Sequence, residues 1–138
     1  MAIMAPPPLP EAPAGRRIGR RWPAKIRDAI RGVKLGVRGH SSFFVHFFAA
    51  TLVVAVATAL QCTIVEWAVL VACIGAVFTA ELFNSALETL FHGLDSEAKQ
   101  RLSGVLDIAA GAVLMASATA AVVGGLVLGY RMWVFLNF

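Results

Sequence analysis

Three long apolar stretches with almost no charged side chain constrain this 138-residue sequence more than any other feature. They lie at about residues 43–60, 64–91 and 104–133. A helix rises about 1.5 Å per residue, so each stretch can cross the roughly 30 Å hydrocarbon core of a bilayer. Hydrophobic residues make up 59% of the chain and charged residues 14%, which is too apolar for an ordinary soluble domain. The sequence therefore predicts an all-α membrane protein with three transmembrane helices.

The segment before the first apolar stretch predicts a helix on the membrane surface. Residues 23–38 repeat apolar side chains at intervals of three and four, and basic side chains occupy the other faces. This pattern is typical of an interfacial helix, although a soluble amphipathic helix that packs against a partner has the same pattern. Residues 1–22 are rich in Pro, Ala and Arg. We expect them to form a disordered tail in front of one membrane domain over residues 23–138.

Basic residues are concentrated near the N-terminus. Nine of the twelve Lys and Arg residues precede Gly39. In front of membrane spans, such a segment is typical of a cytoplasmic end held at anionic headgroups. The loop between the second and third stretches also carries basic residues, so we expect both segments to be cytoplasmic. We expect no nucleic-acid partner, because aromatic residues do not interleave with these basic residues as a single-strand binder would need.

Two carboxylates and an amide mark the end of the second apolar stretch. Glu81, Asn84 and Glu88 are spaced at i, i+3 and i+7, so a helix presents them on one face. Asp107 stands at the start of the third stretch. Carboxylates at the ends of membrane helices that face a bundle are functional candidates. The expected orientation places this cluster at the cytoplasmic boundary, where nucleotides are found.

A cluster of this kind can support phosphoryl transfer. One carboxylate can hold a divalent cation together with nucleotide phosphates, and another can take a proton from the hydroxyl of a lipid alcohol. The same residues could also serve a proton or ion pathway, or hydrogen-bond three helices together. The sequence has no P-loop, glycine-rich kinase loop, zinc motif or nucleophile elbow. Any nucleotide site must therefore be built in another way.

Two motifs carry a close resemblance to a known family. The first reads ELFNSALE at residues 81–88, and the second reads DIAAGAVL at residues 107–114. These residue types, and the gap-free spacing between the motifs, closely resemble the bacterial integral-membrane diacylglycerol kinase family. The resemblance extends over about residues 22–133 and includes the surface helix and all three spans.

This resemblance implies an ATP- and Mg²⁺-dependent lipid kinase that works as a homotrimer in the bacterial cytoplasmic (inner) membrane, with active sites shared between subunits. The implied acceptor is a membrane lipid alcohol, either diacylglycerol or undecaprenol. By position, Glu81 would be the catalytic base, Asn84 would support the base and the phosphates, and Glu88 would be a metal ligand. Asp107 would be a conformational and hydrogen-bonding partner at the third helix.

The chain departs from the family pattern at three positions. The family usually has a metal-binding glutamate where His40 stands, a phosphate-binding lysine at Leu106, and a polar residue such as aspartate at His92. A leucine cannot replace a phosphate contact, so we expect Lys99 or Arg101 to supply it from the loop, or Arg38 to supply it from the surface helix. His40 could still bind the metal, although imidazole suits Mg²⁺ poorly.

These departures leave alternatives open. One is a divergent member that uses another lipid alcohol or phosphate donor. Another is a catalytically weakened or inactive membrane protein that keeps the kinase fold and has a structural or regulatory role. A proton-coupled channel or transporter is disfavoured, because three short spans show neither broken helices nor internal repeats.

Other polar and small residues within the spans have structural interpretations. Glu66 lies beside Trp67 at the far interface, where a charge can reach water. A lone histidine such as His46, close to the start of its span, is more often hydrogen-bonded in the bundle or at headgroup level than a ligand. A stripe of small residues on the third span favours close helix contact in lipid. Its members are Ala112, Ala116, Ala120 and Gly124.

Overall fold

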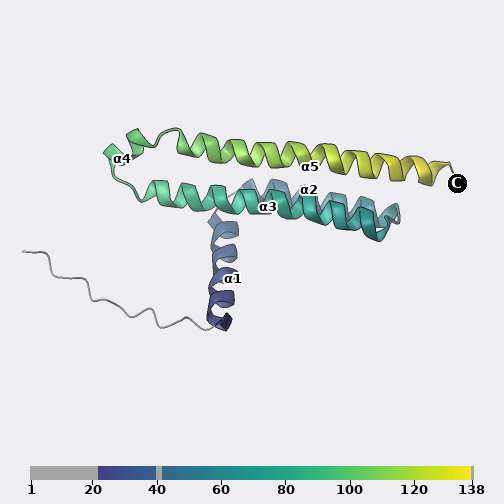
Figure 1. Cartoon of the computed structure of the whole chain (residues 1–138), viewed down its shortest axis with the longest axis horizontal. Coiled ribbons are helices and arrows are strands. Elements are labelled where there is room, and N and C mark those ends of the chain that lie inside the picture. The colour runs from purple at the N-terminus through teal and green to yellow at the C-terminus, as the bar shows by residue number, and fades with distance from the viewer. Residues whose placement is uncertain (1–21, 40–41, 138) are drawn as a thin grey trace, which may run out of the picture.

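The structure, a computed structural model, describes residues 22–39 and 42–137, and most of these residues are helical. Those residues form five helices and no strand. The helices are α1 (Trp22–Gly39), α2 (Ser42–Ala59), α3 (Ile64–His92), α4 (Ser96–Arg101) and α5 (Val105–Leu136) (Figure 1). Three of them, α2, α3 and α5, are long and apolar enough to cross a membrane. The prediction of an all-α protein with three membrane helices is therefore confirmed.

The helix boundaries lie within three residues of the expected ones. The largest difference is at the end of α5, which continues to Leu136 instead of residue 133. The polar connection after α3 contains the short helix α4, which is capped by Asp95, because the Asp95 side chain accepts a hydrogen bond from Ala98 N. Residues 1–21 of the expected tail, and His40, lie outside the described residues.

The connection between α2 and α3 is a tight turn, and side chains bond to the backbone on both sides of it. Gln61 turns the chain with a φ of +53°. Thr63 then caps α3: its hydroxyl and the Glu66 carboxylate each accept a hydrogen bond from the other residue's backbone N–H. The Arg131 side chain, from the end of α5, donates to Leu60 O and Gln61 O. Arg131 therefore joins the last membrane helix to the first connection, and Glu66 has a structural role.

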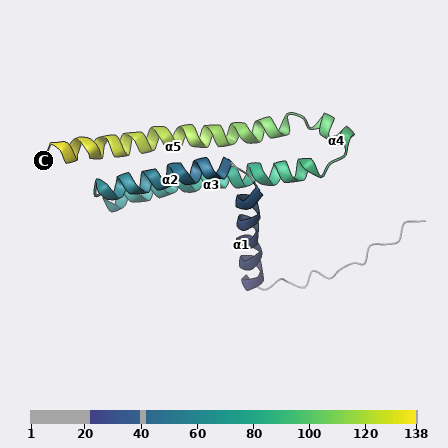
Figure 2. The ribbon, with the colours of Figure 1, turned by 180° about the vertical axis from the view of Figure 1, so that it is seen from behind.

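The main packing interface of the chain joins α3 and α5, which run side by side in both ribbon views (Figures 1 and 2). Small residues allow the two helices to approach closely. A Cβ atom added at the buried Gly124 would lie 3.8 Å from Leu70, whose side chain is 1% exposed. Ala116 and Ala120, which belong to the predicted stripe, also line a groove against α3. The predicted packing role of that stripe agrees with this contact.

Helix α1 runs across the bundle rather than along it (Figures 1 and 2). It crosses α3 at Gly36, where a Cβ atom would lie 2.7 Å from Leu82 Cδ2, so a residue without a side chain permits the contact. Its apolar side chains Ile26 and Ile30 remain more than half exposed. This orientation suits a helix that lies along a membrane surface while α2, α3 and α5 cross it.

Candidate active site

The carboxylate of Glu81 is buried at the contact between α2 and α3. Glu81 is 1% exposed, although its side chain is ionisable. The Ser42 hydroxyl, in the first turn of α2, donates a hydrogen bond to Glu81 Oε1. The Nε2 atom of His46, one turn further along α2, lies 3.9 Å from Glu81 Oε2. Buried carboxylates require partners of this kind, because removal from water is otherwise very costly.

An aromatic cluster holds the start of α2 against α3 beside this carboxylate. Phe78 lies one turn before Glu81, and its ring centroid is 4.9 Å from that of Phe47 and 6.3 Å from that of Phe43. Phe43 is 2% exposed. Because Phe43 and Phe47 flank His46 in the sequence, their packing fixes the register that brings His46 and Ser42 to the carboxylate. The cluster also covers one side of the site with apolar surface.

One turn beyond Glu81, Asn84 and Glu88 form a hydrogen-bonded pair. Asn84 Nδ2 donates to Glu88 Oε1 at 2.8 Å, and Asn84 is 8% exposed. Asn84 Oδ1 is buried without a hydrogen-bond partner among the described residues. Glu88 is half-buried and takes part in a further interaction besides the bond to Asn84. An amide oxygen and a carboxylate therefore lie together, with the amide oxygen available to a ligand.

These two oxygen donors fit a divalent metal ion. Mg²⁺ prefers oxygen ligands and is commonly bound by one or two carboxylates, with phosphates and water completing its shell. Asn84 Oδ1 is an unpaired buried acceptor of the required type. Among the described residues, no group of three or more His, Cys, Asp or Glu side chains could hold a metal by itself. The residues present therefore suit a metal that arrives with phosphate groups.

Asp107 lies in the first turn of α5, and its side chain is exposed. Within the described residues it makes no hydrogen bond or ion pair, and the structure does not bring it to Glu81. Its neighbours Val105 and Ile108 do line a groove against α3 that includes Asn84. The start of α5 is therefore beside Asn84 of the hydrogen-bonded pair, whereas the carboxylate of Asp107 remains open to solvent or to another chain.

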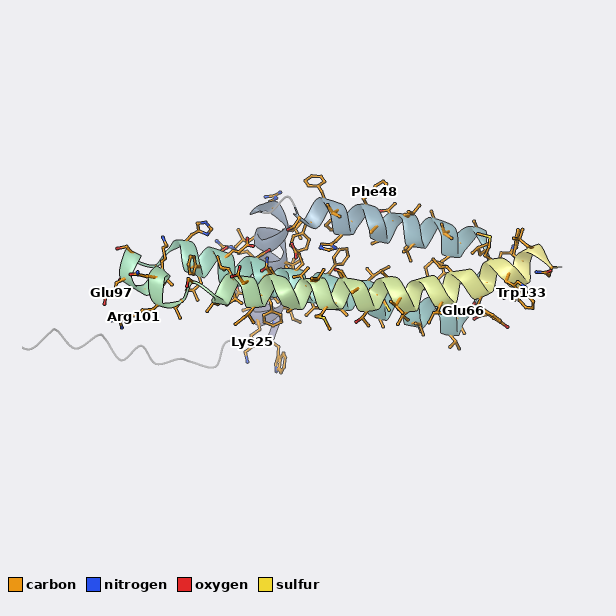
Figure 3. The ribbon with its side chains drawn as sticks, turned by 90° about the horizontal axis from the view of Figure 1, so that it is seen from above. Lys25, Phe48, Glu66, Glu97, Arg101 and Trp133 are labelled. Atoms are coloured by element: carbon orange, nitrogen blue, oxygen red, sulfur yellow. The ribbon has the colours of Figure 1, made fainter. Side chains whose placement is uncertain are left out.

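The two basic candidates in the cytoplasmic loop are placed differently. Lys99 Nζ donates to His92 O at 3.2 Å, so it caps the end of α3 one turn beyond Glu88. Arg101 is on the exposed surface of α4 and pairs with Glu97 at 2.6 Å. Figure 3 shows Glu97 and Arg101 at the end of the molecule opposite to Glu66 and Trp133. Lys99 is therefore the better placed of the two to meet a phosphate near Glu88.

Two of the three departures from the family pattern can be placed. His92 is exposed, and its Nδ1 is 2.7 Å from the backbone oxygen of Glu88, which fixes the ring on the last turn of α3. Leu106 is half-buried at the start of α5. His40, the predicted metal ligand, lies outside the described residues.

Two side chains of the site were not identified from the sequence. Ser42 belongs to a polar turn before the first span and carries no motif. The sequence favours a structural role for His46, and its proximity to Glu81 depends on how α2 lies on α3. The one sequence feature that points to this contact is that His46 is a polar residue in an apolar segment, one helical turn after Ser42.

Three membrane helices, with a buried carboxylate and a neighbouring amide–carboxylate pair, define a multi-pass membrane protein with a polar site between its helices. A family model described as prokaryotic diacylglycerol kinase matches residues 27–128, so the chain belongs to the prokaryotic diacylglycerol kinase family. No curated protein and no solved structure gives a significant match. The family predicted from the two motifs is confirmed. The protein is accordingly a lipid kinase, and kinase chemistry calls for a divalent metal with the nucleotide.

Proposed function

We propose that the protein transfers the γ-phosphate of ATP, with Mg²⁺, to the hydroxyl of a membrane lipid alcohol, either diacylglycerol or undecaprenol. We place this reaction at the cytoplasmic face of the bacterial inner membrane. Family membership supports the lipid kinase activity. The nucleotide, the metal and the acceptor are inferred from the chemistry of the site and from the family resemblance.

The observation that carries the proposal is the order of polar groups along α3. Glu81 is fully buried, Asn84 is nearly so, and Glu88 is half-buried. Seven residues separate the two glutamates, which is about 10 Å along the helix axis. A lipid hydroxyl that reaches the inner carboxylate would therefore face a nucleotide held at the outer one. This order suits a reaction between a membrane substrate and a water-soluble substrate.

Each residue of the site has a role in this reaction. Glu81 takes the proton from the lipid hydroxyl as the lipid oxygen forms its bond to the γ-phosphorus. The bond between that phosphorus and the bridging oxygen breaks, and ADP leaves. Ser42 holds one carboxylate oxygen of Glu81, which leaves the other for the proton. Asn84 Oδ1 and Glu88 would hold the metal, which supplies charge neutralisation when bound.

Cations around the outer end of the site would bind the phosphates. The hydrogen bond from Lys99 to His92 O places the Lys99 side chain near the end of α3. On nucleotide binding, Lys99 would exchange this neutral carbonyl acceptor for a charged phosphate oxygen, which forms a stronger hydrogen bond. Arg101 would have to leave Glu97 to reach the same phosphates. His40 would be a further metal ligand beside Asn84 and Glu88.

The basic segment before α2 supports a cytoplasmic N-terminus, because Lys and Arg in short segments beside membrane spans favour that side. With α1 across the bundle, its basic side chains would meet anionic headgroups. Lys25 and Trp22 pair on this helix, with the Lys25 Nζ 5.1 Å from the indole centroid. An indole and a lysine together suit the headgroup region.

Phosphate transfer to defined lipids tests the proposal. Purified protein in mixed micelles would be given γ-labelled ATP and Mg²⁺ with diacylglycerol or undecaprenol in parallel. We expect label to appear in one lipid, and Glu81→Gln to reduce kcat by at least about 100-fold, because an amide cannot accept the proton. Size-exclusion chromatography would establish that the variant keeps its oligomeric state. Normal turnover by a folded Glu81→Gln protein would exclude Glu81 as the base.

A further inference from the structure

The environment of Glu81 contains a second group that can carry a proton. The Ser42 hydroxyl donates a hydrogen bond to Glu81 Oε1, and His46 Nε2 lies 3.9 Å from the other carboxylate oxygen, Oε2. That separation is too long for a hydrogen bond but within ion-pair range. Shortening by about 1 Å, within the reach of a side-chain rotation, would bring the two atoms to hydrogen-bonding distance.

The surroundings of His46 contain few competing partners. Its ring lines an apolar cleft between α2, α3 and α5, where Cys73 and Ser117 are the other polar side chains among the described residues. Glu81 is the one carboxylate that the described part of the chain places within 4 Å of the ring. The His46 side chain is 18% exposed, whereas that of Glu81 is 2% exposed. His46, one turn from the start of α2, is therefore the more accessible of the two side chains.

We infer that His46 is a positioning residue that accepts the reaction proton from Glu81. The inference rests on the proposed role of Glu81 as the base. Glu81 takes the proton of the lipid hydroxyl, and neutral His46 then takes that proton at Nε2, which regenerates the Glu81 carboxylate and leaves an imidazolium. The imidazolium releases the proton to water. The net reaction is lipid alcohol plus ATP to lipid phosphate, ADP and one proton, so atoms and charges balance.

A relay explains how a carboxylate that solvent cannot reach can act repeatedly. A proton left on buried Glu81 would block the next turnover, since the base must be ionised when the following lipid binds. Ser42 donates a hydrogen bond and has no basic nitrogen, so it cannot remove this proton. The aromatic packing of Phe43 and Phe47 against Phe78 holds His46 over the carboxylate.

The test compares His46→Gln and His46→Ala with wild type in the lipid phosphorylation assay, across a range of pH. Gln keeps hydrogen-bonding capacity but cannot bind a proton at neutral pH. We expect kcat to fall by roughly 100-fold with little change in KM for lipid or ATP. We also expect one ionisation to disappear from the kcat–pH profile, and added imidazole to restore part of the rate of His46→Ala. The matched control is Thr51→Val, because Thr51 lies on the same helix and only bonds to Phe47 O.

A measurement that needs no turnover keeps the inference falsifiable. The ¹⁵N signals of His46 would be followed against pH in wild type and in Glu81→Gln. A coupled pair predicts that Glu81→Gln changes this titration. An unchanged titration, or a His46→Gln protein with wild-type kcat and pH profile, would overturn the inference. If wild type phosphorylates a lipid and Glu81→Gln does not, while His46→Gln is fully active, only the role of His46 fails and the proposed function stands.

Discussion

Asn84 illustrates how much chemistry a single side chain can contribute at this site. Its amide has a donor end and an acceptor end, and the donor end is committed to Glu88 Oε1 at 2.8 Å. The acceptor end is buried without a described partner, which is costly unless a ligand satisfies it. One residue therefore orients a carboxylate and presents a second oxygen beside it. Aspartate would provide oxygens but would repel Glu88, and serine would not reach as far.

At the scale of single residues, the prediction concerns Asn84→Ala. Loss of the amide removes one oxygen ligand and frees the Glu88 side chain, so the metal should bind more weakly. We expect the Mg²⁺ concentration for half-maximal activity to rise by about 10- to 100-fold, the range for lost metal-site support. Initial rates against free Mg²⁺ at saturating lipid would measure it. Thr89→Val is the matched control, since its hydroxyl bonds only to Ser85 O on the same helix. Unchanged Mg²⁺ dependence in Asn84→Ala would remove the amide from the metal site.

At the scale of helices, the sequence predicts well which segments form helices, but it predicts poorly which residues of different helices are in contact. Apolar length alone identifies α2, α3 and α5, because crossing a bilayer requires about 20 apolar residues. The i, i+3 and i+7 spacing also places Glu81, Asn84 and Glu88 on one face of one helix. The contact between Ser42 and Glu81 cannot be predicted in this way, because it depends on the register between α2 and α3. Periodicity describes a single helix and contains no information about that register.

The link from α5 back to the first turn is another contact that sequence patterns do not reveal. Arg131 donates to Leu60 O at 3.2 Å and to Gln61 O at 2.6 Å, and it lies 3.8 Å from Glu66. The two carbonyls belong to the turn that follows α2, where intrahelical donors are missing. The sequence indicates only that Arg131 lies near the far interface. Seventy residues separate the partners along the chain, so packing alone brings them together.

The prediction at this scale is that Arg131→Met destabilises the protein without impairing catalysis. Methionine keeps the apolar stem of the side chain but leaves both carbonyls unpaired, at a cost of about 1–2 kcal/mol. We expect a lower thermal unfolding midpoint in detergent and unchanged kcat at low temperature, because Arg131 lies away from the proposed active site, at the other end of α5 from Asp107. Asn137→Ala is the control, since the Asn137 side chain bonds only to Trp133 O at the same end. A large loss of kcat in a stable Arg131→Met protein would contradict this assignment.

At the scale of the whole molecule, the chain is a thin bundle whose spans bury little of their surface. Large apolar side chains such as Phe48, Leu114 and Leu126 are about 70% exposed, which suits contact with lipid or with other subunits. Asp107 is also exposed, beside the groove that contains Asn84. Carboxylates near membrane helices usually face protein or water-filled cavities. We propose that a neighbouring copy in a homotrimer covers this face and that Asp107 completes the site of that neighbour.

This arrangement predicts that two inactive variants can restore activity when mixed. Glu81→Gln damages the part of the site built on α3, and Asp107→Asn damages the part that would come from α5 of another chain. In randomly mixed trimers, one site in about four would combine intact parts from two chains, so activity should recover to about a quarter of wild type. Mixing Glu81→Gln with Glu88→Gln is the control, because both lesions lie on α3 and cannot complement each other. Subunits would be exchanged by denaturation and refolding together, and lipid phosphorylation would be measured against each variant alone. If recovery is absent although Asp107→Asn alone is inactive and the mixed oligomers form, Asp107 acts within its own chain and each subunit contains a complete site.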